Sequence, residues 1–308
     1  MYNCFIADDG GIITWGGVIM PTYDTWYSDY VALYLRNRKP RTVDGYAQLH
    51  GAYISPGIGP MQLEAVTPED VQRVLLDAGE RGGQRCAQAV YALLRAVMRR
   101  AVRSRRIQWS PIDAVDRPEH TPQPGLALTA ADYTAALPWI LEDVGLSLAL
   151  LAGLRRGEIA GLRWGDVDPA ARQLHVRRQR IRTRAGLIDA PPKSASGVRD
   201  VPLCPELLAI LRRSYQLAPS LRVIDTAPEA IDRRWQRLQQ RELQLSQRYR
   251  LHDLRHTYVS RLLLAGAVPR VVQYVAGHAS LDMTLRVYAH VTGADALREL
   301  DRIATLTR

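Results

Sequence analysis

The most informative segment of this chain is LHDLRHT, at residues 251–257. His252 and Arg255 are three residues apart, so in a helix they lie on the same face. A histidine beside an arginine is a poor metal site, because the positive charge of the arginine competes with the metal. The same pair suits an anion, since both side chains can donate hydrogen bonds. The segment therefore predicts part of an anion site on a helix.

Four other segments of the same half of the chain hold residues with chemical potential. Arg155 lies in LAGLRRGE (residues 151–158), after an apolar run, where its guanidinium would sit at the edge of the core. Lys193 lies in APPKSASGVR (190–199), on a predicted hairpin, and His278 follows a glycine at a predicted helix end. Tyr288 lies in LRVYAH (285–290). Each has an ordinary alternative: a surface arginine, a solvated lysine, a boundary histidine or a core tyrosine.

Taken together and in this order, these residues resemble the active-site set of the tyrosine recombinases, the integrase family that includes phage integrases and the Xer proteins. The strings LRWGDVD (162–168) and GHAS (277–280) strengthen the resemblance, which covers the second half of the chain end to end. It implies a mainly α fold with a small antiparallel β-sheet in the catalytic domain. An all-α N-terminal core-binding domain and this α/β catalytic domain would form a clamp on DNA.

The resemblance also implies a reaction. The Tyr288 hydroxyl would attack a DNA phosphodiester, giving a 3′-phosphotyrosyl bond and a free 5′-hydroxyl, and a partner's 5′-hydroxyl would reverse the attack. Arg155 and Arg255 would clamp the non-bridging oxygens and offset the charge of the transition state. This positive charge fills the role that metal ions have elsewhere. No metal, ATP or organic cofactor is therefore expected.

The same resemblance implies roles for four further residues, two of which transfer protons. Lys193 would protonate the leaving 5′-oxygen, and two nearby guanidiniums should make its proton easier to lose. His252 would help deprotonate the tyrosine, whose hydroxyl is a weak nucleophile at its ordinary pKa of about 10. His278 would donate a hydrogen bond to a phosphate oxygen, and Glu158 would support the site without taking part.

Composition agrees with a nucleic-acid partner. The 308 residues include 41 Lys+Arg against 31 Asp+Glu, a formal charge of +10, and all but Lys39 and Lys193 of the basic residues are arginines. Charge alone does not separate nucleic acid from an acidic protein or a membrane surface. Three distant cysteines fit neither a disulfide framework nor a zinc site, and no apolar run of membrane-spanning length or signal peptide is visible. We expect a protein of the bacterial cytoplasm that acts on DNA and not on a membrane.

Local signals suggest four segments. Residues 1–20 form a short Gly-rich leader, hairpin or disordered, too short for the arm-binding domain of larger phage integrases. Residues 21–115 read as the helical core-binding domain, with a capping box at Thr67-Pro68-Glu69-Asp70. Residues 116–125 are a proline-rich linker, and 126–308 form the catalytic domain. There a helix should begin after Thr129, and the alternation over 172–203 predicts a small antiparallel sheet.

Two basic stretches are predicted to contact DNA phosphates. Over residues 85–106 an apolar stripe of Ala89, Leu93, Val97 and Ala101 leaves arginines on the remaining helix surface. A second set lies on the predicted strand after residue 176. The predicted phosphate contacts are Arg95, Arg99, Arg100, Arg103, Arg105, Arg106, Arg177, Arg178, Arg180 and Arg182.

The C-terminal segment suggests an assembly. Leu297, Leu300, Ile303 and Leu306 form an apolar stripe at helical spacing. The stripe could dock on its own domain, but the resemblance implies a helix that links protomers of a homo-tetramer on two DNA attachment sites. An accessory DNA-bending or directionality factor is a further possible partner.

Several alternatives stay open at this point. They are a Xer-type resolvase, a type IB topoisomerase, and a DNA-binding regulator of the same fold without catalysis. A metal hydrolase built on the seven histidines is more distant. The PPKS string at 191–194 is closer to phage and mobile-element integrases than to Xer proteins. The sequence therefore favours an integrase that inserts or excises a phage or mobile element.

Overall fold

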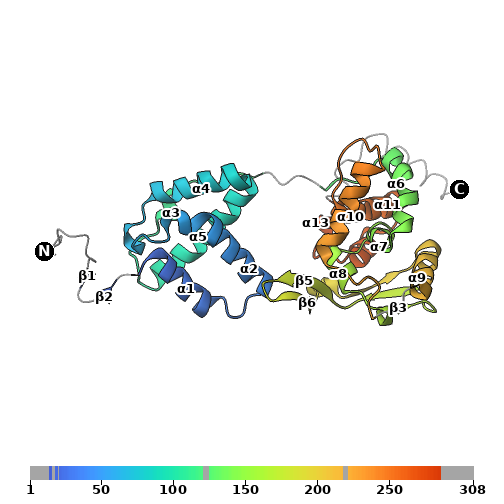
Figure 1. Cartoon of the computed structure of the whole chain (residues 1–308), viewed down its shortest axis with the longest axis horizontal. Coiled ribbons are helices and arrows are strands. Elements are labelled where there is room, and N and C mark those ends of the chain that lie inside the picture. The colour runs from blue at the N-terminus through green and yellow to red at the C-terminus, as the bar shows by residue number, and fades with distance from the viewer. Residues whose placement is uncertain (1–13, 16–17, 20, 121–124, 218–220, 286–308) are drawn as a thin grey trace. The chain divides into compact units, whose positions relative to one another are not determined.

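A computed structural model describes residues 14–15, 18–19, 21–120, 125–217 and 221–285 of the chain. The chain divides after Pro122 into two compact units, residues 1–122 and 123–308 (Figure 1).

The first unit is built of helices around one apolar core. A short antiparallel pair, β1 (Thr14–Trp15) and β2 (Val18–Ile19), precedes them. The helical elements are α1 (Tyr23–Tyr34), α2 (Pro40–Leu49), the π-helical turn η1 (His50–Ile54), α3 (Ser55–Ile58), η2 (Leu63–Ala65), α4 (Pro68–Gly82), α5 (Gln84–Arg103) and η3 (Pro111–Ala114).

Helix α4 begins where the sequence predicts. The Thr67 side chain accepts a hydrogen bond from the backbone N–H of Asp70, and Asp70 accepts one in return from the N–H of Thr67, which confirms the capping box. Helix α5 confirms the basic helix but corrects its bounds and stripe. It ends at Arg103, so Arg105 and Arg106 lie beyond it, and Ala89 is only partly buried.

The second unit combines helices with short strands. Its helices are α6 (Ala130–Glu142), α7 (Val144–Leu151), α8 (Arg156–Gly161), α9 (Pro205–Leu217), α10 (Pro228–Arg241), α11 (Leu251–Leu264), α12 (Pro269–Ala276) and α13 (Leu281–Leu285), with the 3₁₀ turns η4 (Trp164–Asp166) and η5 (Ala195–Gly197). Its strands are β3 (Val167–Asp168), β4 (Gln173–Val176), β5 (Gln179–Thr183), β6 (Gly186–Ala190) and β7 (Arg199–Pro202).

The core of this unit surrounds helix α7, which contacts α6, α8, α9 and α11. Its residues from Gly145 to Leu150 are all buried, which explains why this part of the sequence is apolar without a helical period. Thr129 caps α6, as predicted, and Asp143 ends that helix and caps α7. One apolar run thus forms two helices. No helix in the described part of the chain is long and apolar enough to cross a membrane.

The strands form two small antiparallel sheets where the sequence predicts one. Strand β4 lies between β3 and β7, with Leu174 opposite Val201, while β5 and β6 form a separate hairpin. Gly186 has a φ of +110° at the hairpin turn, a conformation that favours glycine. The two residues between β4 and β5, Arg177 and Arg178, belong to neither strand, and their side chains bind Asp200 and Asp166.

Candidate active site

Two predicted arginines meet at the end of helix α12. The guanidinium of Arg155 donates from Nη2 to the carbonyl oxygen of Gly277, at 2.7 Å, and that of Arg255 donates from Nη2 to the carbonyl of Ala276. The two acceptors belong to consecutive residues at the C-terminus of a helix, where the helix dipole favours positive charge. Residues 100 positions apart in the sequence are therefore held side by side.

Arg155 is oriented by the helix that it precedes. It is the N-cap residue of α8, and Glu158 three residues later accepts both its backbone N–H, at 3.0 Å, and its Nη1, at 2.8 Å. The side chain of Arg155 is 32% exposed, whereas that of Glu158 is 3% exposed. The guanidinium of Arg155 is thus accessible to a ligand, while its backbone N–H and its Nη1 are held by the buried carboxylate of Glu158.

Glu158 binds a second arginine, which the sequence analysis did not single out. Arg199 at the start of β7 is fully buried and donates to both oxygens of Glu158, at 3.1 and 3.0 Å. Burial raises the pKa of Glu158, but Arg199 and then Arg155 outweigh it and lower that pKa to about 2. The strand alternation was a usable signal, because Val201 faces inward and Arg199 lies two residues before it.

Arg255 occupies the deepest position. It lies in the second turn of α11, is 1% exposed and also donates from Nη1 to the carbonyl of Gly153. Burial, followed by the charge of Arg155, lowers the pKa of Arg255 to about 9, so the guanidinium is still protonated at pH 7. Gly153 has a φ of +62° and packs directly under the Tyr258 ring, which leaves no room for a side chain there.

His278 comes directly after the two acceptor carbonyls. Gly277, with a φ of +63°, ends α12 in the left-handed conformation, as predicted from the sequence. The buried His278 ring places Nδ1 2.9 Å from the hydroxyl of Thr284, another residue that sequence reasoning missed. Burial and the guanidiniums of Arg255 and Arg155 lower the pKa of His278 to about 3. The ring is therefore neutral at pH 7.

His252 lies one turn before Arg255 on α11, on the predicted shared face. Its ring packs edge-on against His256, with 4.7 Å between the ring centroids. Packing against its neighbours, then His256 and the arginines 255 and 155, lower the pKa of His252 to about 3. A neutral imidazole at pH 7 can accept a proton.

Two predicted catalytic residues are not placed in this cluster by the structure. Lys193 lies exposed in the loop that follows β6. The end of this loop is nonetheless tied to the cluster, because the Gly197 carbonyl accepts from Arg199 at 3.0 Å. Tyr288 and the C-terminal stripe over residues 297–306 lie outside the described residues.

The predicted phosphate-binding arginines after residue 176 already have acidic partners. Each of the four forms an ion pair with a carboxylate of the same unit. The pairs are Arg177 with Asp200, Arg178 with Asp166, Arg180 with Asp225, at 3.0 Å, and Arg182 with Glu229, at 3.4 Å. Much of the positive charge of this stretch is therefore balanced within the protein.

The arginines of α5 lie on a more open surface. A groove of about 580 Å³ runs along the solvent face of this helix. Arg95, Arg99 and Arg103 line it, together with Arg85 and Arg117, which the sequence analysis did not single out. Arg99 pairs with Asp113 at 2.9 Å, and Arg100 stacks on Tyr34. The groove gathers positive charge from one helix and from the segment after η3.

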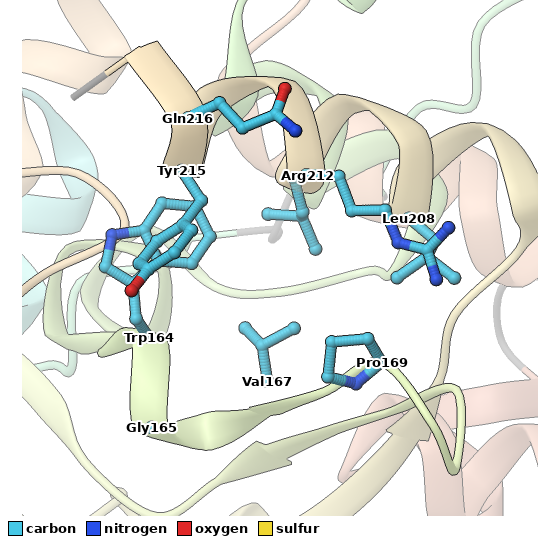
Figure 2. Close-up of a pocket in the computed structure, with 9 residues that line it drawn as sticks. Trp164, Gly165, Val167, Pro169, Leu208, Arg212, Tyr215 and Gln216 are labelled. Atoms are coloured by element: carbon cyan, nitrogen blue, oxygen red, sulfur yellow. The ribbon is translucent and has the colours of Figure 1, made fainter. Parts of the chain in front are cut away.

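A separate, apolar pocket of about 410 Å³ lies between η4, β3 and α9 (Figure 2). Trp164 and Tyr215 meet edge-to-face at one end of it, with ring centroids 5.1 Å apart. Leu208 of α9 and Val167 of β3, on facing sides, also line it. The pocket contains none of the residues predicted for catalysis.

Comparisons with known proteins identify the family of this chain. A family model described as "Phage integrase family" matches residues 128–294, more than half of the chain. The "Putative prophage phiRv2 integrase" of Mycobacterium tuberculosis is 27% identical over 287 residues, covering 87% of this chain and 76% of that protein.

Solved structures share the fold. A Tn1549 transposon integrase in complex with a circular intermediate DNA aligns with a TM-score of 0.75 and 24% identity, over 91% of this chain and 99% of that one. A lambda integrase from a tetramer bound to a Holliday junction aligns with a TM-score of 0.65 and 19% identity, over 87% and 77%. The mainly helical fold with small antiparallel sheets, the clustered arginines and the family match together show that the chain belongs to the phage integrase family of tyrosine recombinases.

Proposed function

We propose that this protein is a site-specific integrase that cuts and rejoins DNA through a 3′-phosphotyrosyl intermediate, inserting or excising a phage or mobile element. The observation that carries the proposal is the pair of guanidiniums, Arg155 and Arg255, fixed on consecutive carbonyls beside His278. Two fixed positive charges suit the two non-bridging oxygens of one phosphate. The names of similar proteins, a prophage integrase and a transposon integrase, support a mobile element as the origin.

The roles of the remaining residues follow from their protonation states. If the Thr284 hydroxyl donates to Nδ1 of His278, the proton of the neutral ring lies on Nε2, which can donate to a phosphate oxygen. Neutral His252 can accept the proton of the attacking tyrosine, for which we propose Tyr288. Lys193 would deliver the proton to the leaving 5′-oxygen. The arginines supply the charge that a metal would otherwise provide, so we propose a reaction without metal or ATP.

DNA binding would use both units of the chain. The α5 groove, with Arg95, Arg99 and Arg103, supports phosphate contact by the first unit, and residues 21–115 would form the core-binding domain. We assign the second unit the catalytic role, with residues 116–125 as the linker. We further propose a tetramer on two attachment sites, linked by the C-terminal segment and acting in the bacterial cytoplasm. A DNA-bending or directionality factor would be an accessory partner.

Covalent capture tests the chemistry and selects the attachment site in the same experiment. The protein is incubated, with EDTA and without ATP, with a labelled library of random duplexes that carry a nick. Adducts that survive denaturant are collected and their DNA is sequenced. We expect a defined duplex, linked by its 3′-phosphate, and no adduct from Tyr288→Phe even though that variant still binds DNA. An adduct with Tyr288→Phe would show that another residue is the nucleophile.

The selected duplex then separates a recombinase from a topoisomerase and from a DNA-binding regulator. A supercoiled plasmid that carries two copies should give excised circles. Relaxation of a plasmid with one copy, and no excision from two, would instead indicate a type IB topoisomerase. Tight binding without any adduct from the wild-type protein would indicate a DNA-binding regulator.

A further inference from the structure

Arg199 has no role in the chemistry proposed above, yet its buried guanidinium joins three segments of the site. It contacts Glu158 of α8 through both carboxylate oxygens. It also donates from Nη1 to the carbonyl of Gly197, at 3.0 Å, and from Nε to that of Val275, at 2.7 Å. Four of its five N–H donors are thus engaged. Its side chain is fully buried, and all four engaged donors face protein groups.

The contacts of Arg199 converge on Arg155 from two sides. On one side Glu158 is shared by the two guanidiniums. On the other side Arg199 packs against Gly277, the residue whose carbonyl accepts from Arg155, so closely that a Cβ there would lie 3.0 Å from Arg199 Cδ. Arg155 itself is partly exposed and has a long, flexible side chain. Its direction therefore depends on partners that Arg199 holds.

We propose that Arg199 is a positioning residue for strand cleavage, which fixes the direction of the Arg155 guanidinium through Glu158 and the Gly277 turn and ties the end of the Lys193 loop to the same point. This inference rests on the proposed recombinase function. This role requires the planar guanidinium of an arginine, because its three nitrogens together bind Glu158, Gly197 and Val275. A lysine would bring one charge and a single nitrogen.

The positive charge of Arg199 predicts how the rate of cleavage depends on pH. The charged groups around Glu158 are Arg199 of β7, Arg155 before α8 and, further away, Arg255 of α11, while the nearby His278 is neutral. Without Arg199, burial of Glu158 is opposed mainly by Arg155, so its pKa must rise. Glu158 would then take up a proton as the pH falls and release Arg155. Cleavage should become sensitive to acid, which loss of packing alone would not cause.

The test uses the full-length protein, the duplex selected with wild-type protein, and the variants Arg199→Lys and Arg199→Met. DNA affinity and the rate of adduct formation at saturating DNA are measured from pH 5 to pH 9. We expect Arg199→Lys to bind within about twofold of wild type but to cleave roughly 100-fold more slowly, as for a misplaced catalytic group. Arg199→Met should in addition lose rate steeply towards acid pH. The matched control Arg213→Met removes an exposed arginine, 3.8 Å from Glu142, and should cleave normally.

The outcomes are separable. If wild-type protein forms no adduct with any duplex, the proposed function fails before Arg199 is tested. If Arg199→Met does not show a cooperative unfolding transition, the decision rests on Arg199→Lys, which keeps the buried positive charge. Wild-type cleavage by a folded Arg199→Lys protein would overturn the inference. So would a folded Arg199→Met protein whose rate follows the wild-type pH profile.

Discussion

Replacing Gly153 by alanine should destabilise the second unit by about 1 to 5 kcal/mol. Gly153 has a φ of +62°, and this conformation costs a residue with a Cβ about 1 to 2 kcal/mol. An added Cβ would lie 2.4 Å from Cδ1 of Tyr258, so the ring must move, and overpacking of this kind costs about 1 to 3 kcal/mol. Alanine also lowers the conformational entropy of the unfolded chain, which offsets about 0.4 to 1 kcal/mol of this destabilisation.

Urea-dependent hydrogen exchange, read by mass spectrometry on peptides of α7 and α11, reports on this unit alone. With a slope of about 2 kcal/mol per molar urea, the midpoint should fall by about 0.5 to 2.5 M. Gly165→Ala is the matched control, because its added Cβ meets nothing within 4 Å and its backbone is ordinary. The control should stay within about 0.5 kcal/mol of wild type. Equal midpoints for the two variants would refute the argument from the Tyr258 contact.

Three further results are expected. The pKa of His278 is about 3 against 6.5 when unfolded, so the unfolded state binds the proton first as the pH falls. The free energy of unfolding should therefore fall by about 2 kcal/mol between pH 7 and pH 5. Urea titrations of His278→Gln should not show this fall. Asp132→Asn should cost about 2 kcal/mol by denaturant unfolding, because the buried carboxylate accepts three hydrogen bonds from residues 246–249. Arg103→Gln should lower the slope of log binding constant against log salt concentration by about one. Arg182→Gln should lower it by less, because Arg182 is already paired with a carboxylate. Equal slopes for the two variants in filter binding would contradict this.

The sequence was sufficient for the parts of the site that depend on local pattern. The spacing of His252 and Arg255 predicted a shared helix face, and Gly277 predicted the helix end before His278. Both features depend on residues within one or two turns of each other. Local pattern therefore identifies which segments matter, and the order of the segments along the chain supports the family resemblance.

The remaining features depend on contacts between distant residues. Arg199 is one arginine among many, and its partner Glu158 lies 41 positions away. The acidic partners of Arg180 and Arg182 lie 45 and 47 positions away, so nothing near these arginines in the sequence indicates that they are already neutralised. Strand alternation could predict that Arg199 points inward, but not which carboxylate it would meet.

The two consecutive carbonyls at the end of α12 give Arg155 and Arg255 one contact each in the same turn of backbone. Loosening that turn would remove one contact from each guanidinium in a single event, leaving Arg155 on Glu158 and Arg255 on the Gly153 carbonyl. A displacement of α12 would therefore weaken both arginine positions together, although the two residues lie 100 positions apart in the sequence.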